Sequence, residues 1–234
     1  SEKLQKINYR YILPIKHQNA MNTIRLKKTL PHVFKQRTNM SSEIWLQDIC
    51  FEKGKTYLIE AASGTGKSSM CSYILGYRND YYGQIMFDET DISQLRISDW
   101  VSIRKNSISH LFQELRLFPE LTALENVEIK NKLTKKASSK QITDWFARLG
   151  ISDKLHSKLG IMSFGQQQRV AMIRALVQPF DFILLDEPIS HLDPDNSRIM
   201  GEIMTEEAQA QGAGIIITSI GKHMDLNYDK IYKL

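Results

Sequence analysis

The chain alternates short apolar segments with longer segments in which apolar residues recur every few positions. Apolar or alternating runs of about four to eight residues are typical of strands, and longer amphipathic segments are typical of helices. We expect strands over residues 22–27, 43–49, 56–59, 84–87, 107–111, 182–185 and 214–218. We expect helices over residues 70–75, 123–133, 139–149, 165–177 and 195–211. Because strands separated by helices pair in parallel, the pattern predicts an α/β fold with a mainly parallel sheet.

Two segments depart from this alternation. Residues 113–162 show no convincing strand pattern and two or three helical segments, which predicts a helical subdomain inserted into a domain of residues 21–234. Residues 1–20 carry scattered aromatics and no clean period, so we interpret them as an N-terminal extension that nucleotide binding does not require.

Composition narrows the class of protein. The 234 residues are 42% hydrophobic and 24% charged, which is ordinary for a globular chain and excludes disordered and collagen-like classes. No apolar run approaches the roughly 18 residues that suggest a membrane span. The two cysteines, Cys50 and Cys71, have no metal-binding spacing, so we expect a reducing, cytoplasmic compartment.

The positive charge is concentrated at the start of the chain. Residues 1–37 hold nine Lys or Arg and one acid, a net +8, whereas the remainder holds 22 basic and 25 acidic residues, a net −3. A nucleic-acid-binding protein needs a basic face on its folded body, so this distribution argues against nucleic acid as a partner. We favour a solvated extension, with contact to anionic lipid headgroups as the alternative.

A phosphate-binding loop is the clearest chemical motif. The strand at 56–59 runs into Ala61-Ala62-Ser63-Gly64-Thr65-Gly66-Lys67-Ser68-Ser69, which opens a helix. Glycines let backbone N–H groups turn around phosphate oxygens, and the helix N-terminus adds the positive end of its dipole. Lys67 is placed to reach the β- and γ-phosphates, and the Ser68 hydroxyl to ligate Mg²⁺. Ala61 stands at the first glycine of the pattern G-x-x-x-x-G-K-[ST], and Gly-Lys-Ser alone also occurs in turns without function.

Two acids follow the apolar strand at 182–185. Ligands in such folds bind at the carboxyl ends of the strands, which is where Asp186 and Glu187 stand. We expect Asp186 to hold Mg²⁺, through water, and Glu187 to accept a proton from the attacking water. The alternative is a strand-ending turn with two surface acids.

Two further segments fit a nucleotide site. Gln113 follows the strand at 107–111, so its amide is placed to touch the metal or the water; alone it is an ordinary loop residue. Ser163 precedes a helix, and its hydroxyl and the N–H groups near Gly165 and Gln166 are suited to bind phosphate. The alternative for Ser163 is an ordinary helix N-cap.

Taken in order, these motifs resemble those of the ATP-binding cassette (ABC) superfamily over about residues 22–234. The motifs of the family are the Walker A motif (61–69), the Q-loop (112–113), the signature (163–169), the Walker B motif (183–188) and the D-loop (190–193). Residues 117–127 resemble the importer-type branch and the lipoprotein-release, cell-division and macrolide-export branches, and residues 229–234 are similar to the latter group. The resemblance implies a P-loop NTPase core of RecA-like fold with an antiparallel β subdomain.

The resemblance also implies partners. Such domains form head-to-tail dimers, here a homodimer or an ABC heterodimer, with each ATP between the P-loop of one subunit and the signature of the other. A groove near the Q-loop grips a transmembrane, permease-type subunit, which would hold the chain at the inner face of the membrane. Leu117, Phe118 and Leu121 are candidates for this contact, or else subdomain core. An aromatic residue after the first strand stacks on adenine in the family; Phe34 is the candidate here, or else a core residue.

Three residues depart from the family pattern: Ala61 and Phe164 replace glycines, and Ser219 stands at the position of the switch histidine, with His223 out of register. Lys67 and Glu187 remain, so the resemblance implies an ATPase, and the departures indicate slow hydrolysis or a specialised subunit. The alternative is a nucleotide-gated regulatory subunit that hydrolyses ATP weakly or not at all. A DNA-repair or chromosome ATPase of related fold is disfavoured, because no heptad-rich stretch is present. Sequence alone leaves export and mechanical signalling open.

Overall fold

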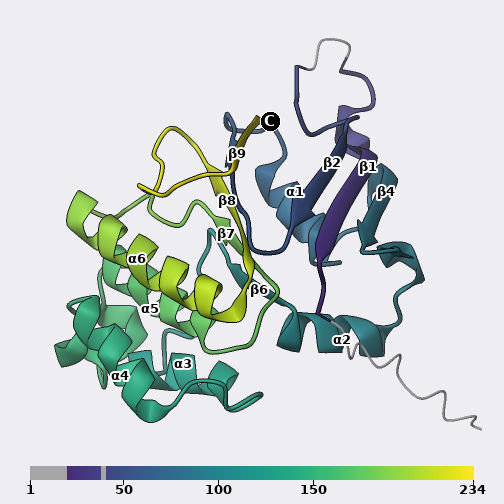
Figure 1. The fold of residues 1–234 in the computed structure, drawn as a ribbon. Helices are drawn as coiled ribbons and strands as arrows, with labels where there is room; N and C mark the ends of the chain where they lie inside the picture. The colour runs from purple at the N-terminus through teal and green to yellow at the C-terminus, as the bar shows by residue number, and fades with distance from the viewer. Residues whose placement is uncertain (1–19, 38–40) are drawn as a thin grey trace, which may run out of the picture.

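The computed structural model describes residues 20–37 and 41–234 and contains two sheets (Figure 1). The predicted extension, residues 1–20, lies outside the described residues except for Ala20. A five-stranded parallel sheet has the order β6-β7-β8-β3-β9, and a four-stranded antiparallel sheet has the order β2-β1-β4-β5. The strands are β1 Thr23–Pro31, β2 Asp48–Glu52, β3 Thr56–Glu60, β4 Tyr81–Phe87, β5 Thr90–Asp91, β6 Ile108–Leu111, β7 Phe182–Asp186, β8 Gly214–Ser219 and β9 Lys230–Lys233. The predicted α/β class is confirmed.

Six α-helices accompany the sheets in the described residues. They are α1 Lys67–Ile74, α2 Ile97–Asn106, α3 Ala123–Asn131, α4 Ser139–Arg148, α5 Phe164–Leu176 and α6 Pro194–Gln211. Short 3₁₀ turns cover His32–Phe34, Ile92–Gln94, Ser152–Lys154 and Leu159–Ile161. Residues 113–162 hold α3 and α4 and no strand. That they form an inserted subdomain stays a prediction. No helix in the described ranges is both long and apolar enough to cross a membrane.

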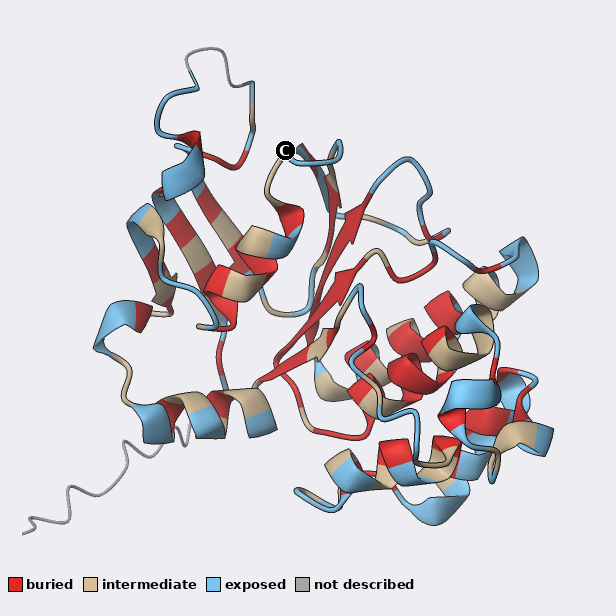
Figure 2. Cartoon of the chain, turned by 180° about the vertical axis from the view of Figure 1, so that it is seen from behind, coloured by how far each residue is buried: buried red, intermediate tan, exposed pale blue. Residues whose placement is uncertain are grey.

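The parallel sheet is buried on both faces, which explains its continuous apolar strands. Along β7, Ile183 and Leu185 belong to the core cluster under α5 and α6, whereas Phe182 and Leu184 belong to the cluster on the α1 side. Figure 2 shows these strands buried along most of their length. Because neighbouring side chains on a strand point to opposite faces, one apolar run fills two cores. The carboxyl ends of β3, β6, β7 and β8 are thereby held in fixed positions.

The strand predicted over residues 43–49 is wrong. The Ser42 hydroxyl accepts hydrogen bonds from the backbone N–H groups of Ile44 and Trp45, which makes a turn there. Leu46 has a left-handed φ of 62°, a conformation that interrupts a strand. The ladder therefore starts only at Asp48.

Helix α2 is absent from the sequence prediction. Its buried residue Ile103 lies on the inner face, but Ile97 and Val101 are 85% and 59% exposed. Apolar residues on both faces obscure the helical period. The helix begins where the Asp99 carboxylate accepts a hydrogen bond from the Arg96 backbone N–H at 3.0 Å.

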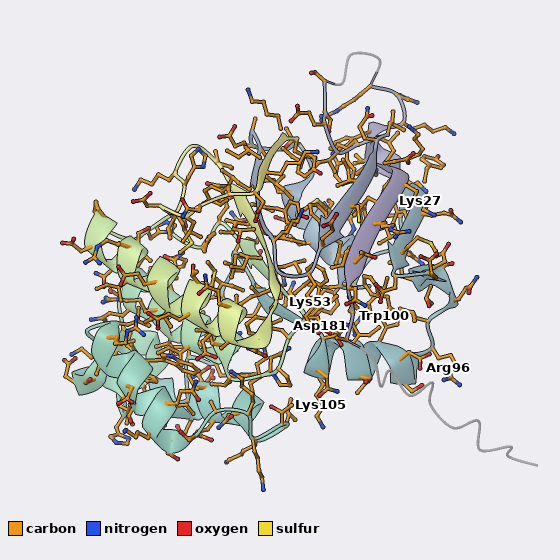
Figure 3. All side chains as sticks on the ribbon, in the orientation of Figure 1. Lys27, Lys53, Arg96, Trp100, Lys105 and Asp181 are labelled. Atoms are coloured by element: carbon orange, nitrogen blue, oxygen red, sulfur yellow. The ribbon has the colours of Figure 1, made fainter. Side chains whose placement is uncertain are left out.

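Part of the basic N-terminal stretch belongs to the folded domain. Arg25, Lys27 and Lys28 lie on β1, so the positive charge is not confined to an extension. At the start of this strand the Met21 N–H donates to Asp181, whose carboxylate also pairs with Lys53 at 2.5 Å (Figure 3). This largely buried pair ties the antiparallel sheet to the start of β7.

Candidate nucleotide site

The phosphate-binding loop connects β3 to α1. Gly64 and Gly66 have φ values of 76° and 101°, in the left-handed region that favours glycine. The Thr65 hydroxyl donates to the Ala62 carbonyl at 2.8 Å and tightens the turn. Ala61 is not among the described residues with positive φ, so alanine replaces the usual glycine there without backbone strain.

A tryptophan that the sequence analysis missed supports this loop. Trp45 is 2% exposed, and its indole N–H donates to the Thr65 carbonyl at 2.9 Å. A side chain on Gly66 would approach the rings of Trp45 and Phe34 to 3.1 Å. The loop therefore lies directly over a buried aromatic floor. Trp45 comes from a turn before β2, so its local sequence carries no sign of this contact.

Oxygen ligands converge at the start of α1. Ser68 Oγ donates to Asp186 Oδ2 at 2.8 Å and lies 3.4 Å from Gln113 Oε1. Asp186 Oδ1 accepts a hydrogen bond from Thr218 at 2.5 Å, which fixes the carboxylate at the sheet edge. Hydroxyl, amide and carboxylate oxygens are the hard donors that Mg²⁺ prefers, and one carboxylate suffices where phosphate and water complete the shell. The three residues fit a magnesium ion.

Lys67 and Glu187 form the second half of the site. Lys67 Nζ lies 2.9 Å from Glu187 Oε1, and their side chains are 8% and 12% exposed. Glu187 has a φ of 50°, and its backbone is held by the Thr218 carbonyl and the Gln168 amide. A left-handed non-glycine residue costs roughly 1–3 kcal/mol and is concentrated at functional sites. The turn after β7 thus aims the carboxylate at the P-loop lysine.

The switch position has a different arrangement. Ser219, the last residue of β8, is 4% exposed, and its hydroxyl donates to the Lys222 carbonyl in the loop that follows. His223 pairs with Glu60, the last residue of β3, at 3.1 Å between Nε2 and Oε1. The loop after β8 therefore holds both side chains in contacts with the protein.

The signature segment starts α5. Ser163 is the N-cap, its hydroxyl accepting from the Gln166 N–H at 3.3 Å, so the ordinary N-cap interpretation holds within one subunit. Phe164 is 42% exposed, and its ring packs edge-on against His191 of the D-loop with centroids 4.4 Å apart. A side chain on Gly165 would approach the His191 carbonyl to 3.2 Å, so glycine leaves room for this close packing. The signature and D-loop form one exposed surface.

Phe34 lies away from solvent. It is 5% exposed, belongs to the core cluster on the α1 side, and has the Arg37 guanidinium 4.2 Å above its ring. This burial favours the core alternative, with Phe34 supporting the P-loop from below. Stacking of Phe34 on adenine stays a prediction.

A known protein family matches the part of the chain that carries these motifs. The family described as "ABC transporter" matches residues 47–190, more than half of the chain. The chain therefore belongs to the ABC transporter family and is an ABC-type ATPase domain, as the order of motifs predicts.

Three relatives illustrate how far the sequence of this chain resembles those of known proteins. The lipoprotein-releasing system ATP-binding protein LolD of Saccharophagus degradans is 34% identical over 171 residues, 71% of this chain and 75% of LolD. The macrolide export ATP-binding/permease protein MacB of Shewanella sp. ANA-3 is 29% identical over 193 residues, 80% of this chain and 29% of MacB. The ABC transporter ATP-binding protein Rv0073 of Mycobacterium tuberculosis is 35% identical over 143 residues, 60% of this chain and 43% of Rv0073. The chain spans less than half the length of the latter two relatives.

Two solved structures share the fold of this chain. The dimeric structure of MJ0796, a bacterial ABC transporter cassette, superposes with a TM-score of 0.70 at 25% identity, covering 84% of this chain and 87% of MJ0796. A post-hydrolysis state of MJ0796 bound to ADP and Pi superposes with a TM-score of 0.68 at 26% identity, with the same coverage.

Proposed function

We propose that the chain binds ATP with Mg²⁺, hydrolyses it slowly, and uses an ATP-dependent dimer to drive a transmembrane partner. One observation carries this proposal. Lys67, Ser68, Asp186 and Glu187, from two segments more than 100 residues apart, meet at one edge of the parallel sheet. Gln113 from a third segment joins them.

Each residue has a chemical role in this proposal. The P-loop N–H groups and Lys67 bind the phosphates, and Glu187 accepts a proton from the attacking water. Ser68, Asp186 and Gln113 would hold Mg²⁺, which when bound would neutralise phosphate charge.

The ion pair between Lys67 and Glu187 links nucleotide binding to the release of the base. A phosphate at the P-loop competes for the lysine, so nucleotide binding releases the carboxylate for its work as a base.

The dimer would complete the site. Ser163 and the N-terminus of α5 are exposed at the molecular surface, and within one described chain no hydrogen bond joins Ser163 to the P-loop. A second cassette, identical or related, would place its signature against this chain's ATP. The dimeric MJ0796 cassette supports such an assembly.

Slow hydrolysis follows from Ser219. A histidine can reach further than a serine, and this serine hydroxyl is already bonded to the Lys222 carbonyl. Losing one preorganised transition-state contact typically reduces the rate by about 10²–10³. The same observation supports the second candidate, a nucleotide-gated subunit with little turnover.

The membrane partner would contact the face that carries α2 and α3. Phe118 is 49% exposed at the start of the helical subdomain, and Asn126 bonds its backbone N–H and carbonyl, which fixes the loop. Leu117 is partly buried against the core cluster. Of the three predicted contacts, Phe118 is the one best placed for a partner. Such a partner would hold the chain at the inner face of the membrane.

The test is Glu187→Gln. This variant removes the proton acceptor but keeps the shape of the side chain, so ATP should still bind while phosphate release falls by about 10²–10⁴. The ATP-bound dimer should accumulate and be visible by light scattering. Glu202→Gln, an exposed acid on α6, is the matched control and should behave as the parent.

Two results separate the candidates. A parent chain that releases phosphate and a Glu187→Gln chain that does not would establish the ATPase. A parent with no turnover that still dimerises on ATP would favour the nucleotide-gated subunit. Equal turnover in parent and variant would show that Glu187 is not the base.

A further inference from the structure

One buried side chain of α5 is polar. Gln168 is 2% exposed, whereas the other buried residues of this helix are all apolar: Val170, Ala171, Met172, Ile173, Ala175 and Leu176. A methionine at this position would bury a side chain of similar volume without an amide, and burying an amide is unfavourable unless it is fully hydrogen-bonded. Packing of α5 alone therefore does not explain a glutamine here.

The Gln168 amide contacts the backbone of the proposed base. Its Nε2 donates to the Glu187 carbonyl oxygen at 3.3 Å. The other amide atom, Oε1, is buried and has no hydrogen-bond partner among residues 20–37 and 41–234. Because a buried acceptor without a partner lowers stability, this glutamine is less favourable for the fold than an apolar residue of the same shape. Its value to the protein lies in the one contact that it makes.

The backbone of Glu187 requires restraint, because its conformation is unfavourable. Its φ of 50° lies in the left-handed region that residues other than glycine rarely adopt. The Glu187 N–H donates to the Thr218 carbonyl at 3.1 Å, which fixes the residue to β8. The Gln168 amide fixes its carbonyl group on the side of α5. With both backbone groups held, the carboxylate points at Lys67, 2.9 Å away.

The start of α5 lies along the chain segment that begins with the base. Phe164, four residues before Gln168 and so on the same helix face, packs against the ring of His191. Gly165 lies close to the backbone of His191 as well, since a Cβ there would be 3.2 Å from its carbonyl oxygen. The exposed end of the helix and the turn of Glu187 are therefore in contact through one continuous face.

We propose that Gln168 is a positioning residue for ATP hydrolysis. Its amide holds the Glu187 carbonyl and so keeps the turn after β7 in the conformation that directs the carboxylate at the attacking water. The inference rests on the proposed function, in which Glu187 is the base. No proton passes through Gln168. A base that is displaced slows the chemical step without changing how ATP is held, so the loss should fall on kcat and not on KM.

The competing interpretation is a structural link between α5 and β7, and Gln168→Met separates the two. The variant removes the amide and keeps an unbranched side chain. The kcat of phosphate release should fall about tenfold, equivalent to about 1.4 kcal/mol in the barrier. The KM for ATP-Mg²⁺ and the ATP-dependent dimer, followed by light scattering, should stay as in the parent. The melting temperature should stay within about 4 °C of the parent.

Gln178→Met is the matched control. Gln178 is also 2% exposed, and its amide donates to the carbonyl oxygens of Arg104 and Ile108, outside the nucleotide site. This variant loses hydrogen bonds of the fold alone, so it should melt lower than the parent and keep the parent's kcat. Gln168→Asn has an amide one methylene too short for the Glu187 carbonyl. It should lose kcat as Gln168→Met does, and it provides the test if methionine does not pack.

Three results would overturn the proposal. The first is a folded Gln168→Met chain, or the Asn variant in its place, with the kcat of the parent. The second is a rise in KM or a loss of the dimer, which would assign Gln168 to nucleotide binding or to assembly. The third is a loss of kcat that Gln178→Met shares, with both variants melting lower, which would make Gln168 a structural link. A parent that releases no phosphate would refute the proposed ATPase itself, and that result comes from the parent alone.

Discussion

The two sides of the nucleotide site differ in completeness. On the P-loop side, all four expected residues are present, and they contact one another in two pairs, Ser68 with Asp186 and Lys67 with Glu187. Around the expected γ-phosphate position, Ser219 replaces the family histidine next to the P-loop, where its carbonyl accepts from the Ala61 N–H at 3.0 Å. Phe164 replaces a glycine of the signature, which the proposed dimer places against the ATP of the other subunit. In the proposed function, the first set binds nucleotide and accepts a proton, and the second holds water and phosphate in the closed dimer. The contrast suggests a cassette in which binding is retained and turnover is reduced.

Departures from a motif are not equal in consequence. Ala61 also replaces a family glycine, yet its backbone needs no left-handed conformation, so the change is harmless to the loop. Ser219 changes the reach and the donor of a side chain that would touch phosphate, and its hydroxyl is already used. The effect of a departure from the motif therefore depends on the local geometry at that residue, and not on how many residues differ.

The largest change is expected for Ser219→His. If the missing imidazole limits chemistry, single-turnover hydrolysis should rise by about 10²-fold, the usual value of one preorganised contact. Quenched-flow measurement of ADP formation provides the rate, and His223→Gln, a few residues along the same loop, is the control. An unchanged rate, with ordinary turnover in the parent, would show that the serine is harmless.

A smaller gain is expected for Phe164→Gly. Removing the ring lets the backbone at the start of α5 approach a phosphate on the opposite subunit. The ATP-dependent dimer should tighten by about tenfold, equivalent to about 1.4 kcal/mol. The affinity of this dimer is measured by analytical ultracentrifugation, with Glu187→Gln present in every protein compared. Phe118→Ala, another exposed phenylalanine, should leave dimerisation unchanged; a dimer weakened by Phe164→Gly would mean that the ring itself is part of the interface.

The smallest change tests the P-loop side. Trp45→Phe keeps the aromatic floor but removes the hydrogen bond to the Thr65 carbonyl, worth about 0.5–1.5 kcal/mol. ATP affinity should fall about fivefold without loss of fold. Isothermal titration calorimetry gives the affinity, and Trp100→Phe, which removes no contact with the P-loop, controls for tryptophan loss. Unaltered affinity would indicate that the loop keeps its shape without Trp45.

Sequence and structure agree best where the chemistry is local. The loop from Ala61 to Ser69 and the acids after β7 follow directly from strand, turn and helix signals, and the structure brings them together. Trp45 was missed, because its role arises from a contact with the distant Thr65 carbonyl. Helix α2 was missed since Ile97 and Val101 place apolar residues on its solvent face. These exposed residues lie on the face where we place the partner.

The most direct test of the account is the melting temperature of the chain with and without ATP-Mg²⁺, compared with Lys67→Ala. Ligand at about 100 times Kd stabilises a protein by about 2.7 kcal/mol. For a domain of this size the parent should therefore melt roughly 5–11 °C higher with nucleotide. Lys67→Ala should lose most of that rise while folding normally. A parent whose melting temperature does not move in saturating ATP-Mg²⁺, or a variant that shifts as far as the parent, would contradict the nucleotide site built around Lys67.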